Sequence, residues 1–108
     1  MLHNYGGEHS MYGGMYNIGS SPVSAHAEYK DTMVGTGMTP EAIEHNPIIY
    51  ELMNEMGWRN EAVNVEEWTE LYIERRYGGL SPSASAAWKH FLKGVYNHGM
   101  DSLWIVHV

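Results

Sequence analysis

The chain has 108 residues, which allows one small domain with a modest hydrophobic core. Its net charge of −7, with only six Lys and Arg, argues against binding to nucleic acids or to anionic membranes, because both require basic patches. The absence of Cys excludes disulfides and thiolate metal sites within the chain, and no apolar run reaches the roughly 18 residues that a transmembrane helix needs.

The N-terminal residues predict one strand followed by helical segments. Residues Met1–Tyr5 precede a Gly pair, which is typical of a strand that ends in a turn. His3 and Asn4 lie near the predicted strand end, where side chains commonly face a ligand. Apolar residues at helical spacing predict a helix over Glu8–Ile18, and a second short helix is expected over Ser24–Tyr29.

The run Thr32–Asn46 predicts a second strand that leads into a helix. Thr32–Val34 are expected to end this strand, and a Gly-Thr-Gly turn follows them. Thr39 is expected to cap the next helix and Pro40 to occupy its first turn, so that Glu41 lies where the strand passes into the helix. From spacing alone, Glu41 is better interpreted as an acidic residue that stabilises a helix end than as a catalytic group.

The remaining residues predict three helices in succession. Apolar spacing and flanking glycines place them at Pro47–Met56, Val65–Tyr77 and Pro82–Asn97. Asn64 is expected to cap the second of these, with Glu67 completing a capping box. Three tryptophans with apolar neighbours at helical spacing are expected in the core: Trp58, Trp68 and Trp88.

Five separate motifs of this chain resemble one family of enzymes. They are MLHNYGGEHSMYGG (1–14), MVGTGMTPEAIEHN (33–46), ELMNEMGWR (51–59), ERRYG (74–78) and AAWKHFLKGVYN (86–97). In this order they resemble the α-N-acetylglucosaminidases of glycoside hydrolase family 89, over residues 1 to about 97. The resemblance covers only a late portion of a much longer enzyme, so the chain is expected to be a fragment.

The resemblance implies an α/β fold class. It assigns residues 1–63 to the late strands and helices of a (β/α)8 barrel, the C-terminal part of a TIM-barrel catalytic domain. Residues 64–108 are then the start of an all-α C-terminal domain, with an atypical tail over 98–108 that does not resemble the family.

The resemblance also implies the chemistry of the site. Glu41 falls on the position of the catalytic nucleophile of a retaining glycosidase, which works with a second carboxyl group about 5–5.5 Å away. The family's general acid/base Glu lies upstream of the matched region, and no residue here corresponds to it. The isolated chain is therefore expected to be inactive. His3 and Asn4 are second-rank candidates for substrate binding, and ordinary turn roles are the alternative for both.

The implied substrate is a carbohydrate that ends in α-linked N-acetylglucosamine, such as heparan sulfate, in a lysosomal or secreted parent enzyme. The chain shows no signal peptide of its own, because its start lacks basic residues and an apolar stretch. No cofactor is implied, and no metal site is expected, since the His and Glu residues lack the HExxH spacing. The alternative is a non-catalytic remnant whose three helices act as a packing or interaction module.

Overall fold

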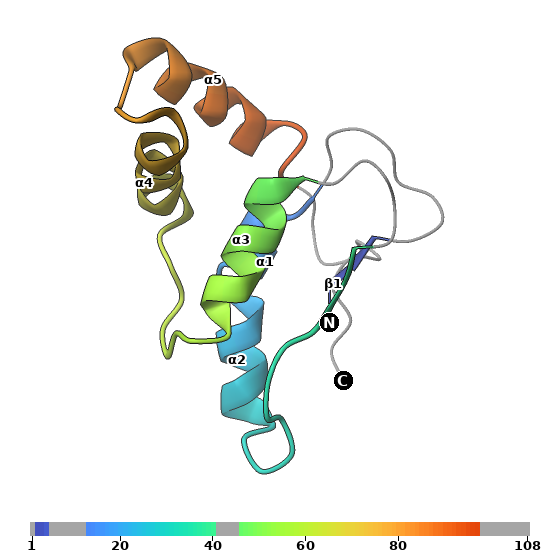
Figure 1. Cartoon of the computed structure of the whole chain (residues 1–108). Coiled ribbons are helices and arrows are strands. Elements are labelled where there is room, and N and C mark those ends of the chain that lie inside the picture. Colours follow the sequence, from blue (N-terminus) through green and yellow to red (C-terminus); the bar gives the residue numbers. More distant parts are fainter. Residues whose placement is uncertain (1, 5–12, 41–45, 98–108) are drawn as a thin grey trace.

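The computed structural model describes residues 2–4, 13–40 and 46–97, and these residues form a mostly helical fold with one pair of short strands (Figure 1). The elements in chain order are β1 (Leu2–Asn4), α1 (Met15–Ile18), α2 (Ser21–Glu28), β2 (Met38–Pro40), α3 (Pro47–Met56), α4 (Val65–Tyr77) and α5 (Pro82–Lys93). Glu41, the first part of the helix predicted over Glu8–Ile18, and the tail over 98–108 lie outside the described residues.

The two strands are parallel, and the second strand is not where the sequence predicted it. Residues 33–37 have no regular structure, and Val34 is fully exposed, so the prediction of a buried strand end at Thr32–Val34 is wrong. The strand instead forms where the chain meets β1, with Thr39 opposite His3 and Pro40 opposite Asn4. Pro40 therefore lies in the strand and not in the first turn of a helix, whereas the residues that Thr39 was expected to cap lie outside the described residues. Proline is compatible with this place because a two-stranded sheet has only edge strands.

Both helices that connect the strands differ from their predicted bounds. Gly13 has φ of 153°, which no helix contains, so helix α1 comprises only Met15–Ile18. Helix α2 starts at Ser21 rather than Ser24, because Pro22 fits the first turn, where its missing N–H group has no helical partner to lose.

Helices α3 and α4 have the bounds that the sequence predicted, since both have clear start and stop signals. The Asn64 side chain accepts a hydrogen bond from the Glu67 backbone N–H at 3.1 Å, and Gly78 ends α4 in the left-handed conformation. Helix α5 ends at Lys93 instead of Asn97, because Gly94 leaves the helical conformation with φ −108° and ψ −102°.

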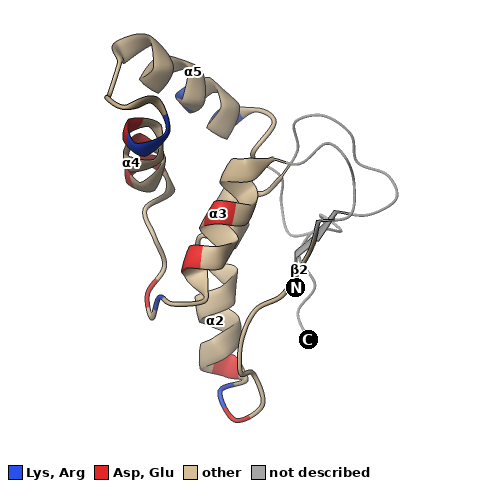
Figure 2. Ribbon diagram, in the orientation of Figure 1, with Lys and Arg blue, Asp and Glu red and all other residues tan. Residues whose placement is uncertain are grey.

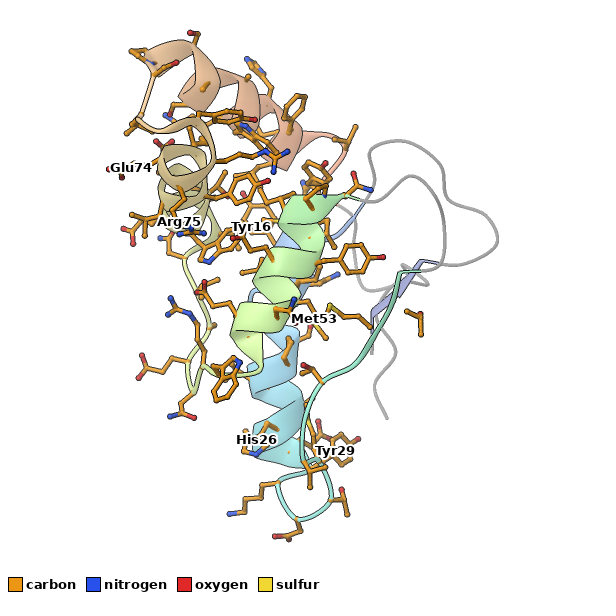
Figure 3. The ribbon with its side chains drawn as sticks, in the orientation of Figure 1. Tyr16, His26, Tyr29, Met53, Glu74 and Arg75 are labelled. Atoms are coloured by element: carbon orange, nitrogen blue, oxygen red, sulfur yellow. The ribbon has the colours of Figure 1, made fainter. Side chains whose placement is uncertain are left out.

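Charged residues along helix α4 are arranged favourably for the helix dipole (Figure 2). Its first turn carries Glu66 and Glu67, and its last turn carries Arg75 and Arg76. Negative charge at the N-terminus and positive charge at the C-terminus of a helix both interact favourably with its dipole. The Tyr16 hydroxyl donates a 2.7 Å hydrogen bond to Glu66, which links α1 to the start of α4 (Figure 3).

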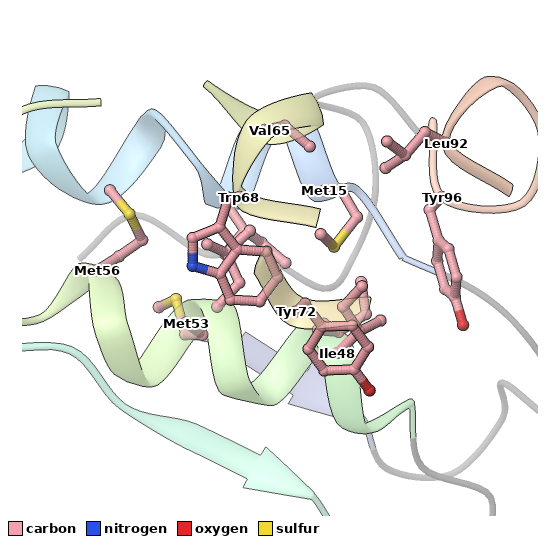
Figure 4. Close-up of a cluster of buried hydrophobic side chains, with 12 residues drawn as sticks. Met15, Ile48, Met53, Met56, Val65, Trp68, Tyr72, Leu92 and Tyr96 are labelled. Carbon is pink, nitrogen blue, oxygen red and sulfur yellow. The ribbon is translucent and has the colours of Figure 1, made fainter. Parts of the chain in front are cut away.

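One buried cluster joins α1, α3, α4 and the end of α5 (Figure 4). Its members are Met15, Ile18, Ile48, Ile49, Leu52, Met53, Met56, Val65, Trp68, Tyr72, Leu92 and Tyr96. Trp68 is in this core as predicted, and Trp88 packs against it while partly buried. The prediction for Trp58 is wrong: it follows Gly57, where α3 has ended, and it is 91% exposed.

The cluster contains residues from both sides of Val63, and α1 packs on α3 while α4 packs on α5. The division into domains 1–63 and 64–108 stays a prediction. The fold class is supported only in its coarser form, as helices with a parallel strand pair, because two strands among the described residues do not close a barrel.

Candidate functional site

The candidate site lies at the carboxyl ends of β1 and β2. Because the strands are parallel, both ends meet at the same edge of the sheet, with Asn4 directly opposite Pro40. In α/β folds, this is the edge at which ligands and catalytic groups gather. The structure thus brings the backbones of His3 and Asn4 beside the end of β2. Glu41, the next residue along the chain, lies outside the described residues, as do the side chains of His3 and Asn4.

The core holds β2 and the start of α3 in place. Met38, the first residue of β2, packs against the buried cluster. The chain is described again from Asn46, which is 6% exposed and stands before Pro47, the first residue of α3. The first turn of α3 then contributes Ile48 and Ile49 to the core. Both ends of the segment that contains Glu41 are therefore attached to packed structure.

Tyr96, near the end of the described residues, contacts the start of α3. Its hydroxyl donates a buried hydrogen bond of 2.9 Å to the Asn46 side-chain oxygen. Its backbone carbonyl accepts a 3.0 Å hydrogen bond from the Met15 N–H, and an antiparallel bridge between Gly14 and Asn97 lies beside it. Sequence reasoning did not identify Tyr96 or Asn46, because no local pattern marks a pair separated by fifty positions.

Burial controls the chemistry of the Tyr96 hydroxyl. Loss of water around the side chain, with a smaller contribution from Tyr72, raises the pKa of Tyr96 to about 12, from an ordinary value of 10.0. The hydroxyl therefore keeps its proton, and can donate a hydrogen bond to Asn46, to a higher pH than an exposed tyrosine would.

Other features of the described residues lie away from this edge. A pocket of about 110 Å³ is lined by residues of α2, the segment 33–36 and the end of α3, and one of about 250 Å³ lies between α4 and α5. Within the described ranges, no three His, Asp or Glu residues are grouped as a metal site would need, and no helix has the length and apolar character to cross a membrane.

Comparison with known proteins gives a consistent result. Residues 1–60 match the family model described as the alpha-N-acetylglucosaminidase (NAGLU) tim-barrel domain. Human alpha-N-acetylglucosaminidase is 44% identical over 98 residues, which cover 90% of this chain but 13% of the human protein. The chain thus spans about an eighth of the length of this relative.

Solved structures of a family 89 glycoside hydrolase from Clostridium perfringens have the same local fold. The complex with 2-acetamido-1,2-dideoxynojirmycin matches with a TM-score of 0.85 and 40% identity, over 94% of this chain and 11% of that one. A complex with PUGNAc matches with a TM-score of 0.84 and 40% identity, over 94% and 12%. A third structure, with two Glu-to-Gln substitutions, holds its substrate GlcNAc-alpha-1,4-galactose and matches with a TM-score of 0.84 and 40% identity, over 94% and 11%.

Proposed function

Because the chain belongs to the alpha-N-acetylglucosaminidase (NAGLU) family of glycoside hydrolases, we propose that it forms part of the active site of a retaining exo-glycosidase. The reaction is hydrolysis of terminal α-linked N-acetylglucosamine. Glu41 is the nucleophile, and His3 and Asn4 bind the sugar. The general acid/base Glu comes from a part of the enzyme that the matched residues do not include.

The reaction proceeds in two displacements. The Glu41 carboxylate attacks the anomeric carbon and forms a glycosyl ester while the bond from that carbon to the leaving oxygen breaks. The acid/base Glu gives its proton to the leaving oxygen, which is typically worth about 10²–10⁴-fold in rate. The same residue then takes a proton from water, which attacks the anomeric carbon, releases Glu41 and restores the original configuration.

The parallel pairing of β1 with β2 is the observation that carries this proposal. The register sets Asn4 opposite Pro40, the residue that precedes Glu41 in the sequence, at the edge where β1 also ends. A nucleophile must be held rigidly at the cleft, and a strand anchored in the core through Met38 provides such a base. The substrate complex of the bacterial relative, with its two altered glutamates, supports a mechanism with two carboxyl groups.

We propose heparan sulfate-type chain ends as the substrate, in a lysosomal or secreted enzyme. The α-linked N-acetylglucosamine in the substrate of the bacterial relative supports the terminal sugar and its linkage. The net charge of −7 and seven His residues are compatible with an acidic compartment, since protonated His would offset part of the negative charge near pH 5.

The test is a chimera in which residues 1–97 replace the matched segment of human alpha-N-acetylglucosaminidase. We expect the chimera to release the aryl group of an aryl α-N-acetylglucosaminide, and Glu41→Gln to abolish this release. In Glu41→Ala, added azide should restore turnover, because the small anion reaches the anomeric carbon in place of the carboxylate and leaves as a β-glycosyl azide. Glu28→Gln, at the exposed end of α2, is the matched control and should remain active.

Two outcomes would contradict the proposal. An inactive chimera would show that this segment cannot serve as the catalytic one, and an active Glu41→Gln variant would remove Glu41 from the reaction.

A second candidate function rests on exposed apolar side chains. Trp58, Leu71 and Leu80 are 91%, 54% and 54% exposed, which is compatible with packing against another protein region. In this alternative the helices form a non-catalytic packing or interaction module. The chimera distinguishes the two, since such a module leaves Glu41→Gln as active as the unaltered chimera.

A further inference from the structure

Tyr96 forms hydrogen bonds with two separate parts of the chain. Met15, the first residue of α1, donates its N–H to the Tyr96 carbonyl at 3.0 Å. Asn46, the residue before α3, accepts from the Tyr96 hydroxyl through its side-chain oxygen at 2.9 Å. One residue therefore binds the starts of both helices, one through its backbone and one through its side chain.

The ring of Tyr96 is itself held firmly. It stacks on Trp88 with 6.1 Å between centroids and 9° between planes, and it meets the Phe91 ring edge-on at 6.3 Å. The side chain is 3% exposed, and Figure 4 shows it beside Leu92 at the edge of the buried cluster. A donor on a ring packed in this way has little freedom to follow a moving acceptor.

The residues before α1 also lie close to the start of α3. A Cβ atom built on Gly13 would lie 2.5 Å from Cδ1 of Ile49, so only glycine lets the chain pass this close to α3 here. Ile49 is in the first turn of α3, three residues after Asn46. Tyr96 thus stabilises the region in which the residues before α1 pack against the first turn of α3.

We propose that Tyr96 is a positioning residue for the reaction, acting through its hydrogen bond to Asn46 on the segment that contains Glu41. This inference rests on the proposed function of Glu41. Packing alone does not require the hydroxyl, because phenylalanine fills almost the same volume. The hydroxyl adds a fixed anchor five residues from the nucleophile, and the helical region thereby contributes to the geometry of the strand-end site.

The chimera described above tests the inference through Tyr96→Phe, with Tyr72→Phe as the matched control. Tyr72 is another core tyrosine of the helical region, also 3% exposed, and it lies on α4. Displacement of a reacting group by about 1 Å can cost on the order of 10²-fold in rate. We expect Tyr96→Phe to lower kcat by roughly 10- to 100-fold with KM changed less than about twofold, and Tyr72→Phe to leave both unchanged.

Asn46→Ala removes the same hydrogen bond from the other side. If the bond acts as a unit, the double variant Tyr96→Phe/Asn46→Ala loses no more kcat than Asn46→Ala, whereas independent roles give multiplied losses. Thermal unfolding of each variant confirms that the assay temperature lies below the transition.

The outcomes separate the inference from the function on which it rests. If Glu41→Gln is inactive but Tyr96→Phe has the kcat of Tyr72→Phe, the positioning role is wrong while the proposed function stands. If both Tyr96→Phe and Asn46→Ala fail to fold, the bond is structural and the positioning role is also wrong. If Glu41→Gln is active, the proposed function fails first.

Discussion

Replacement of Gly13 by alanine tests the junction between the segment after β1 and helix α3. Gly13 is buried and has φ of 153°, a backbone conformation that residues with a side chain rarely adopt. A Cβ at this position would lie 2.5 Å from Cδ1 and 2.8 Å from Cγ1 of Ile49, and Ile49 is 2% exposed. The added methyl group therefore has neither a relaxed backbone nor free space.

The expected loss in free energy of unfolding for Gly13→Ala has two separate causes. A residue held in a glycine-type conformation costs about 1–3 kcal/mol, and an extra methyl in a packed core typically costs about 1–3 kcal/mol. We therefore expect Gly13→Ala to lower the free energy of unfolding by about 2–6 kcal/mol, a large part of the 5–15 kcal/mol or so that is typical of a domain. Gly79→Ala is the matched control, since no atom lies within 4 Å of its Cβ and its φ is not positive.

The assay is urea unfolding of the 108-residue chain, followed by tryptophan fluorescence. Ile49→Val removes the nearest atom, Cδ1, so the loss in Gly13→Ala/Ile49→Val should be smaller than the sum of the two single losses. The reasoning would be refuted if Gly13→Ala unfolded at the same urea concentration as Gly79→Ala, or if the two losses simply added.

Three further predictions concern the helix cap, alkaline pH and the isolated chain. Asn64→Ala removes the acceptor for the Glu67 N–H and should destabilise the chain by about 1 kcal/mol in the same urea assay, whereas Asn64→Asp should retain most of the stability. Burial raises the pKa of Tyr96 above the value of 10.0 expected when unfolded, to about 12, so the unfolded state loses its proton first and stability should fall as pH rises from 10 to 12. Tyr96→Phe should flatten this fall in a series of urea titrations, and an unchanged slope would show that another group is responsible. The isolated chain should release no aryl group from an aryl α-N-acetylglucosaminide, and turnover that disappears in Glu41→Gln would contradict this.

The sequence predicts the helices well where local chemistry decides them. Helix α4 begins at a side chain that caps it, Asn64, and ends at a glycine that can adopt the left-handed conformation, Gly78. Both signals act within one turn of the helix, so no distant contact is needed to locate its ends. The bounds of α3 follow in the same way from Pro47 and Gly57.

Strand β2 could not be located in this way because its partner decides its position. Thr32–Val34 and Met38–Pro40 both contain residues that suit a short strand, and only the second lies beside β1. The choice depends on hydrogen bonds to residues far away in the sequence. Trp58 illustrates the same limit, since its apolar character favours burial but its place beyond the end of α3 exposes it.

The candidate site likewise has features that the local sequence predicts and features that depend on tertiary contacts. Glu41 was identified through a resemblance in motif, and His3 and Asn4 through their place at a predicted strand end. The strand register adds that the backbones of His3 and Asn4 lie beside β2. The Tyr96–Asn46 hydrogen bond could not be predicted, because it joins the end of the helical region to the start of α3 through tertiary packing alone.

Covalent labelling of Glu41 tests the central claim most directly. The reagent is a glycosyl fluoride of N-acetylglucosamine with a second fluorine on the ring carbon beside the ring oxygen, which slows both steps while the fluoride leaving group favours the first. Peptide mass spectrometry of the labelled chimera should then find the sugar as an ester on Glu41. A label on any other carboxylate, in an enzyme that the reagent inactivates, would contradict the account.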